Sequence, residues 1–366
     1  MKVYFINVIL IGILSSCVTH NKEIKITLTD KVKINAIELI ATDTLVNPSM
    51  NVEAYTQAVY QDSILIVWNR GNSNRPFLEF KKLDDNTLIK SFFQKGNGPD
   101  ELLSFQYYLV DKSKMHLLDA VKGIVINIDV DSLLDNTCKI NQDEFLISFG
   151  LKGPWVMNEK LFYHNTYVYE NNEINLNVEG NKFIAKDAVR EHINNLSQYK
   201  YRTTNINHGF VIVNEDIERF IYFSNSQPKF EIFDTNLNRL KSVEFTHDLT
   251  EQKFIKTEYP NVTEYIFNST VPEAFTTSWC DNTYIFAVYI GSEISTKNGV
   301  YDKELLSQPS YILQFNWDGD LIQSYYLNYH IKSISVSNCG NWLYANIFDD
   351  EGESSVVKYR IHNNYQ

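Results

Sequence analysis

The sequence is short of the residues on which metal and redox sites depend. It has only four cysteines, at positions 17, 138, 280 and 339, and no two of them form a Cys-x-x-Cys pair. A zinc site or a redox-active disulfide therefore has no support. If the chain is exported from the cytoplasm, one disulfide could form among the last three cysteines. We expect Cys280 and Cys339 to be buried free thiols instead, because each lies near a strand-like run.

Local motifs for catalysis and cofactor binding are absent as well. Neither Gly-x-x-x-x-Gly-Lys-Ser/Thr nor a helix-opening Gly-x-Gly-x-x-Gly occurs, so phosphate and dinucleotide loops are missing. Gly-x-Ser-x-Gly and His-Glu-x-x-His are missing too, which counts against a serine hydrolase and a zinc peptidase. The eight histidines are scattered along the chain. We therefore predict no cofactor, no metal and no catalytic residue from motifs.

Basic residues are outnumbered by acidic ones, 33 to 45, and the formal net charge is −12. Binding to nucleic acid depends on Lys and Arg that neutralise phosphates. An acidic chain of this kind is therefore expected to have no nucleic-acid partner. The same charge balance argues against docking on anionic lipid by electrostatic attraction.

No apolar run is long enough for a spanning helix, but the N-terminus has the pattern of an export signal. Val3–Leu14 is apolar except for Asn7, and about 12 residues fall short of the roughly 20 that a transmembrane helix needs. Leu14-Ser15-Ser16-Cys17 follows, and it resembles the lipobox of bacterial lipoproteins. The resemblance implies acylation of Cys17 and anchoring at the cell envelope, facing the periplasm or the cell surface. An ordinary secretory signal that contains a cysteine is the alternative.

No Pro-, Gly- or Ser-rich linker divides the remaining chain, which favours one domain. The expected organisation is a lipoprotein signal peptide at 1–16, a polar lipidated tether at 17–23 and one folded domain at 24–366. Aromatic residues make up 14% of the sequence. Within the folded domain, runs such as Ile64–Trp68 and Tyr284–Tyr289 have the composition of buried strands. The fold class is therefore all-β.

These runs recur as a repeat. Each copy has an apolar strand, a turn rich in Asn, Asp or Gly, and a second apolar run. The equivalent position in the third strand of the six copies is occupied by Phe80, Ile128, Leu176, Phe233, Phe315 and Tyr359. Six repeats, mostly about 50 residues apart, are typical of a six-bladed β-propeller. We also predict short helical insertions, at about 186–199 and at 251–256 within a long fifth-repeat insertion at 250–278.

Closing the ring requires a strand from the other end of the chain, because an open propeller would expose strand edges. Two early strand-like runs, Ile24–Leu28 and Lys33–Leu39, precede the first complete repeat. We therefore predict that an N-terminal strand pairs into the last blade.

Two stretches resemble a known family, the TolB-like six-bladed β-propeller lipoproteins of Bacteroidetes. Lys95-Gly96-Asn97-Gly98-Pro99-Asp100-Glu101 is similar to the family's Gly-x-Gly-Pro-Gly-Glu-Phe signature between the first two blades, with Asp100 and Leu102 as departures. Phe315-Asn316-Trp317-Asp318-Gly319-Asp320 is similar to its aromatic-x-Trp-Asp-Gly turn. The resemblance covers about 40–361. It implies the fold and no particular activity.

Candidate binding residues are few. Glu101 is expected in a glycine-dependent connection between blades, from which it could reach a ligand. Trp279 lies near a strand end, and Tyr259, Tyr265 and Phe267 lie in the long insertion, where rings could anchor a partner. For each ring, packing within the fold is the competing interpretation.

Function is expected to be binding or scaffolding at the envelope, with an envelope protein, a peptide or a glycan as partner. The alternative is a glycoside hydrolase or lyase, which would need two carboxylates converging at the channel. The carboxylates beside strand runs are Glu53, Asp62, Glu101, Asp119, Asp281 and Glu293. A structural subunit of an envelope complex is a third possibility.

Overall fold

The structure is a computed structural model that describes the strands and the shorter connections of the chain. The described residues are 22–27, 36–45, 54–69, 75–104, 106–109, 113–119, 121–135, 141–144, 151–157, 160–165, 167–168, 182–185, 201–202, 209–225, 227–246, 254–259, 262–267, 270–297, 300–301, 309–348 and 354–361. Cys17 and the predicted signal peptide lie outside them, as do the helix expected at 186–199 and Cys138. Within these ranges, no helix is long and apolar enough to cross a membrane.

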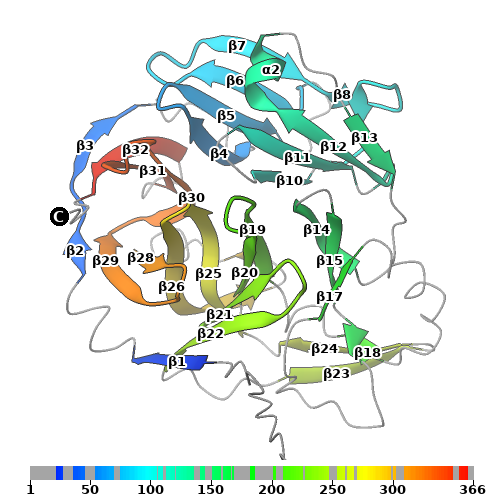
Figure 1. Ribbon diagram of the computed structural model, residues 1–366, viewed down its shortest axis with the longest axis vertical. Helices are drawn as coiled ribbons and strands as arrows, with labels where there is room; N and C mark the ends of the chain where they lie inside the picture. Colours follow the sequence, from blue (N-terminus) through cyan, green and yellow to red (C-terminus); the bar gives the residue numbers. More distant parts are fainter. Residues whose placement is uncertain are drawn as a thin grey trace, which may run out of the picture.

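Antiparallel blades are arranged in a ring, and Figure 1 shows them around a common centre. Blade 1 has strands β4 (Ala54–Tyr60), β5 (Ile64–Asn69), β6 (Leu78–Lys82) and β7 (Leu88–Phe92). Blade 2 has β10 (Gln106–Leu109), β11 (Lys114–Asp119), β12 (Ile124–Asp129) and β13 (Asn141–Glu144). A short helix, α2 (Val130–Leu134), follows β12, and Asp129 caps it by accepting a hydrogen bond from the Ser132 amide.

Blades 3 and 4 continue the ring. Blade 3 has β14 (Leu151–Met157), β15 (Lys160–Asn165) and β17 (Lys182–Ala185). Blade 4 has β19 (Gly209–Asn214), β20 (Arg219–Ser224), β21 (Lys229–Asp234) and β22 (Arg239–Thr246). The repeat position expected at Leu176 lies outside the described residues, and the third described strand of blade 3 is β17.

Blades 5 and 6 complete the circle. Blade 5 has β25 (Thr270–Cys280), β26 (Tyr284–Lys297), β28 (Ser310–Asn316) and β29 (Leu321–Leu327). Blade 6 has β30 (His330–Val336), β31 (Trp342–Phe348) and β32 (Ser354–Arg360). The all-β, six-bladed prediction is therefore confirmed.

Three N-terminal strands add to the outer edges of three blades. β1 (Lys22–Thr27) pairs parallel with β22, and β2 (Ile37–Glu38) pairs parallel with β29. β3 (Ala41–Thr44) pairs antiparallel with β32 and becomes the fourth strand of blade 6. The predicted closure of the last blade by an N-terminal strand is present, although the strand that closes it lies after both of the early runs.

The core consists of apolar layers between neighbouring blades. One layer packs blade 1 against blade 2, a second packs blade 4 against blade 5, and a third packs blade 5 against blade 6. Leu65 and Val67 of blade 1 also pack against Tyr344 and Val356 of blade 6, which joins the first blade to the last. Fully burying each such side chain contributes roughly 1.5–3 kcal/mol, so closure of the ring is an apolar contact as well as a strand pairing.

The two ends of the ring differ. At one end, which we call the short-turn end, brief turns join the first strand to the second and, in blades 1, 4 and 5, the third to the fourth; in blade 2 the corresponding connection begins with α2. These turns include 61–63, 83–87, 215–218, 235–238, 281–283, 317–320 and 337–341. The opposite end, which we call the long-connection end, holds the connections between blades and between second and third strands. Its long connections include 93–105, 166–181 and 247–269.

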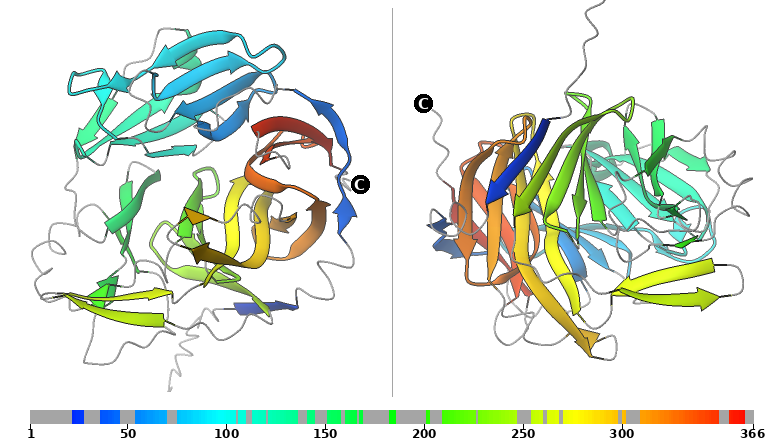
Figure 2. Two further views of the ribbon diagram at one scale, coloured as in Figure 1. Left: turned by 180° about the vertical axis from the view of Figure 1, so that it is seen from behind. Right: turned by 90° about the horizontal axis from the view of Figure 1, so that it is seen from below.

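Extra strands form at the long-connection end. β16 (Tyr167–Val168), β18 (Tyr201–Arg202), β24 (Val262–Phe267) and β23 (Phe254–Tyr259) make one appended sheet. β27 (Val300–Tyr301) extends the β25–β26 hairpin, and β8 (Gln94–Lys95) pairs with β9 (Glu101–Leu102). Figure 2 shows the β23–β24 hairpin and the projecting end of β26 at the same end of the ring.

The prediction of a helix at 251–256 is wrong for the residues of that segment that the structure describes. Residues from Phe254 onward form β23, which pairs along its whole length with β24. Alternating Phe, Ile and Thr suit a pleated strand, and this pairing decides the conformation over the local helical preference of Glu, Gln and Lys. The insertion also ends earlier than expected, because the inner strand of blade 5 begins at Thr270.

Candidate functional site

Glu101 lies in a compact turn at the long-connection end. Its Oε2 accepts a hydrogen bond of 2.7 Å from the Gly98 amide, and the Lys122 Nζ donates to the carbonyls of Gly98 and Glu101 at 2.9 and 2.6 Å. A Cβ on Gly96 would lie 2.1 Å from Glu101 Oε2, which explains the glycine. The carboxylate therefore holds its own loop together, and the position needs no ligand to explain it.

Asp119 fastens the same connection to blade 2. Its side chain is fully buried and accepts hydrogen bonds from the amides of Leu103 (2.7 Å) and Ser104 (3.2 Å) and from the Ser104 hydroxyl (2.9 Å). The amides of Val121 and Lys122 also donate to it, both at 3.0 Å. This carboxylate is occupied by turn amides, so it is poorly placed to act on a substrate in the channel.

Trp279 lies on β25, the inner strand of blade 5. Its half-buried ring packs against the apolar layer between blades 5 and 6, with its centroid 5.9 Å from that of Phe286. Trp68, another ring near a strand end, is 1% exposed in the layer between blades 1 and 2. Both tryptophans therefore stabilise contacts between blades.

The three aromatic residues of the insertion belong to the β23–β24 hairpin. Its register pairs Tyr265 with Lys256, Phe267 with Phe254 and Tyr259 with Val262. Because successive strand residues alternate between faces, Tyr265 and Phe267 occupy positions on one face of the hairpin, and Tyr259 occupies a position on the other. The structure brings two of the three together.

Asp281 lies at the short-turn end, in the turn between β25 and β26. Its Oδ1 accepts from the amides of Thr283 and Tyr284, both at 2.7 Å, and its carbonyl accepts from Asn214 Nδ2 at 3.0 Å and Trp317 Nε1 at 2.8 Å. These bonds tie turns of blades 4 and 5 together. Asp281 and Trp317, which the sequence places in strand-end motifs, therefore fix the frame.

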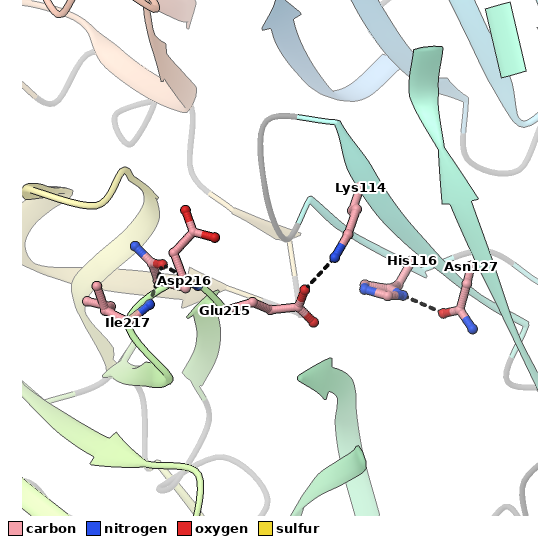
Figure 3. Close-up of polar contacts among 7 residues, drawn as sticks. Lys114, His116, Asn127, Glu215, Asp216 and Ile217 are labelled. Carbon is pink, nitrogen blue, oxygen red and sulfur yellow. Dashed lines mark hydrogen bonds and ion pairs between the residues drawn. The ribbon is translucent and has the colours of Figure 1, made fainter. Parts of the chain in front are cut away.

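A polar group at the short-turn end joins blades that are not neighbours (Figure 3). Lys114 of blade 2 forms a 2.8 Å ion pair with Glu215, which lies in the β19–β20 turn of blade 4. His116 lies close by, and its Nδ1 is 2.5 Å from Asn127 Oδ1. Burial lowers the pKa of His116, so the ring is neutral at pH 7, and its buried Nε2 has no hydrogen-bond partner. Sequence spacing gave no sign of this group, because its members come from two separate blades.

Glu273 was also missed by the sequence reasoning. It lies on β25 at the long-connection end, and its buried Oε2 has no hydrogen-bond partner. Burial raises its pKa to about 7. The neighbouring Ala274 amide donates to the Asn225 carbonyl at 2.6 Å, which brings this part of β25 against a turn of blade 4. One sequence signal was available: a charged residue inside the apolar run 271–275.

The candidate carboxylates are spread over both ends of the ring; Glu53 lies outside the described residues, and Glu293 lies on β26. Glu101 and Asp119 belong to turns at the long-connection end, whereas Asp62 and Asp281 belong to turns at the short-turn end. No group of three or more His, Cys, Asp and Glu residues that could hold a metal ion occurs among the described residues either. Nothing in this geometry favours the glycosidase alternative.

The two described cysteines are free thiols. Cys280 is half-buried, with its Sγ 3.7 Å from the Val213 carbonyl. The expectation of a buried thiol is wrong for Cys339, which is exposed in the turn between β30 and β31. Its strand-like neighbours end at Val336, and a turn position leaves the thiol in solvent.

Comparison with known proteins agrees with the fold. The chain belongs to the family described as TolB-like 6-blade propeller-like, whose model matches residues 38–339. A DUF4221-family protein from Bacteroides vulgatus has a similar structure, with a TM-score of 0.54, 11% identity, and coverage of 90% of this chain and 99% of that one. A Bacteroides fragilis protein described as exported gives a TM-score of 0.48 and 12% identity, covering 93% and 99%. No curated protein matches the chain.

Proposed function

We propose that this protein is a lipid-anchored propeller of the cell envelope that binds a partner through its long-connection end. One observation carries the binding proposal. The appended sheet of β16, β18, β24 and β23 and the β8–β9 pair gather at one end of the ring, while the described connections at the opposite end are brief turns and the short helix α2.

This arrangement suits recognition because a rigid frame positions variable segments. Propeller blades pack against both neighbours and leave their connections exposed at the ends of the ring. Connections on a rigid frame commonly carry the binding function of a protein. The partner is an envelope protein, a peptide or a glycan, and no observation among the described side chains supports turnover of it.

The anchoring part of the proposal rests on Leu14-Ser15-Ser16-Cys17 at the end of a short apolar run. More than one acyl chain gives stable membrane attachment, whereas a single chain is only marginal. Changing Cys17 to Ala should release the protein from membranes or leave the precursor uncut, as measured by fractionation and mass spectrometry. An intact mature C17A protein in the membrane fraction would show that the anchor lies elsewhere.

The binding part can be tested by recovering partners from envelope extracts. One variant replaces 254–267 with a two-residue turn and thereby removes the β23–β24 hairpin. The matched control is D318N, which changes the exposed tip of a turn at the opposite end. We expect the first variant to lose the partner and the control to keep it. A glycosidase and peptidase screen runs beside it, and hydrolysis abolished by two carboxylate-to-amide changes would overturn the binding proposal.

The register of the hairpin sharpens this test. Tyr265 and Phe267 occupy positions on one face, so Y265A and F267A should reduce partner recovery together. Y259A changes the other face and serves as the control. Equal losses from all three substitutions would indicate unfolding of the hairpin and not removal of a contact surface.

A further inference from the structure

The path of β1 fixes where the chain enters the ring. β1 pairs parallel with β22, the outer strand of blade 4, and its first residue, Lys22, lies opposite Lys241. Lys241 comes just after the 235–238 turn, at the short-turn end. The last residue, Thr27, lies opposite Thr246. The right-hand view of Figure 2 shows β1 running from the level of the short turns toward the end where β26 projects.

The tether before β1 is short. Cys17 precedes Lys22 by five positions, and five residues of fully extended chain span at most about 18 Å. An acyl group on Cys17 must therefore lie within about that distance of the short-turn end of blade 4. Because β1 pairs along its whole length with β22, this limit holds for the short-turn end of blade 4.

We infer that the protein is held with its short-turn end toward the lipid surface and its long-connection end toward the surrounding space. The inference rests on the proposed anchoring at Cys17 and extends it from attachment to orientation. It gives the two ends separate tasks: one faces the membrane, and the other is left free for a partner.

Charge at the short-turn end determines how closely the ring approaches the lipid. Its exposed side chains include many carboxylates and would be repelled by anionic headgroups. Those carboxylates include Asp62, Asp84, Asp85, Asp216, Glu218, Asp318 and Asp320, and they outnumber the exposed lysines Lys82 and Lys114 at the same end. Such repulsion acts over about 10 Å at 0.1 M salt, and the tether is long enough to allow this gap. The ring therefore faces the membrane without lying flat against it.

The experiment compares the two ends of one blade. Asp318 and Asn328 are both exposed and flank β29 (Leu321–Leu327), Asp318 at the short-turn end and Asn328 at the long-connection end. At about 3.3 Å per residue, the two sites are roughly 20–25 Å apart along the strand. D318C and N328C are made in the full chain, with Cys138, Cys280 and Cys339 replaced by Ser or Ala. The acylated proteins are labelled with a fluorescent donor and reconstituted into vesicles that contain an acceptor-labelled headgroup lipid.

We expect energy transfer from position 318 to exceed that from position 328 by roughly two-fold or more, given their separation along β29. A ten-residue Gly-Ser insertion after residue 21 should abolish the difference, because the longer tether no longer orients the ring. Equal transfer from the two positions, or stronger transfer from 328, would overturn the inference. Mass spectrometry of the N-terminal peptide separates the two proposals: an unacylated Cys17 contradicts the anchoring, whereas acylation with equal transfer contradicts only the orientation.

Discussion

The short-turn end and the long-connection end of this ring are built by different means. At the short-turn end, several turns satisfy their own amides: Asp234 accepts from the amides of Asn236 and Asn238, and Asn316 accepts from those of Asp318 and Asp320. The contacts between blades at this end, such as that of Asn214 with the Asp281 carbonyl, are made by single side chains. At the long-connection end, segments far apart in the sequence meet, as when β18 pairs with β24 in the appended sheet.

This difference separates stability from recognition. Self-contained turns with Asp or Asn side chains are locally specified and rigid, so they fix the ends of the strands whatever the other end carries. The sequence and length of the long connections can then change without opening the ring. If this view is correct, damage to the frame should affect both ends together, whereas changes to an individual end should have smaller and local effects.

The largest effect is expected from opening the ring. Deleting the chain after Gly340 removes β31 and β32, and with them the apolar contacts of blade 6 with blades 5 and 1. Both ends should lose their structure in one transition, because the ring can no longer close. Circular dichroism and thermal melting are the measurements.

The control deletes only 362–366, which follow the last described residue, Ile361. That truncation should melt like the full chain. If the protein cut after Gly340 also melted like the full chain, the ring would not depend on closure, and the two ends would be independent of the frame.

Next in size is the loss of the buried carboxylate that fastens a long connection. D119A should destabilise the protein by about 3 kcal/mol, because it leaves the amides of two turns without the buried carboxylate that accepts their hydrogen bonds. D234A, at the short-turn end, changes a partly exposed carboxylate that accepts from two amides of its own turn, and it should cost about 1 kcal/mol. Urea unfolding measures both. Equal costs would mean that the two ends are fastened in the same way.

Much of the frame was predictable from the sequence. Alternating apolar runs separated by Asp, Asn and Gly turns indicated the blades, and the repeat gave their number. The glycine of the Trp317-Asp318-Gly319 turn, with a φ of +80°, shows why this punctuation is readable: the backbone conformation itself requires that residue. Local rules of this kind act within a few residues, which is the range that sequence reasoning covers well.

The long-connection end was less predictable for a physical reason. β23 forms because it pairs with β24, which in turn pairs with β18. The local sequence at 251–256 taken alone favoured a helix. Tryptophan is common in binding sites, but the ring of Trp279 packs between blades. Glu273 is buried next to Ala274, whose amide bonds to a turn of the neighbouring blade. Each of these outcomes depends on contacts between distant segments, which one sequence does not display.

A pH-dependent effect of intermediate size is expected from Glu273. Its folded-state pKa of about 7 lies above the ordinary value of 4.5. The neutral carboxyl therefore stabilises the fold fully below pH 4.5, and this stabilisation is lost as the pH rises through 7. A shift of this size corresponds to about 3 kcal/mol. E273Q keeps the neutral form, so its advantage in melting temperature over the unchanged protein should grow from pH 5 to pH 8.

E38Q changes an exposed carboxylate on β2 and is the control. Its melting temperature should follow that of the unchanged protein at each pH. A constant difference between E273Q and the unchanged protein across this range would show that Glu273 does not titrate between pH 4.5 and 7.

The smallest effect is expected from the ion pair between blades 2 and 4 at the short-turn end. The Lys114 side chain is 55% exposed, so solvent screening limits the pair to at most about 1 kcal/mol. A double-mutant cycle with K114M and E215Q should give a coupling free energy of that order, which vanishes in 1 M salt. The pKa of His116 supplies a second measurement by NMR: Lys114 lowers it and Glu215 raises it. K114M should therefore raise that pKa, and E215Q should lower it. A coupling of several kcal/mol would mean that this pair fastens the frame, and the short-turn end would then depend on a long-range contact as the opposite end does.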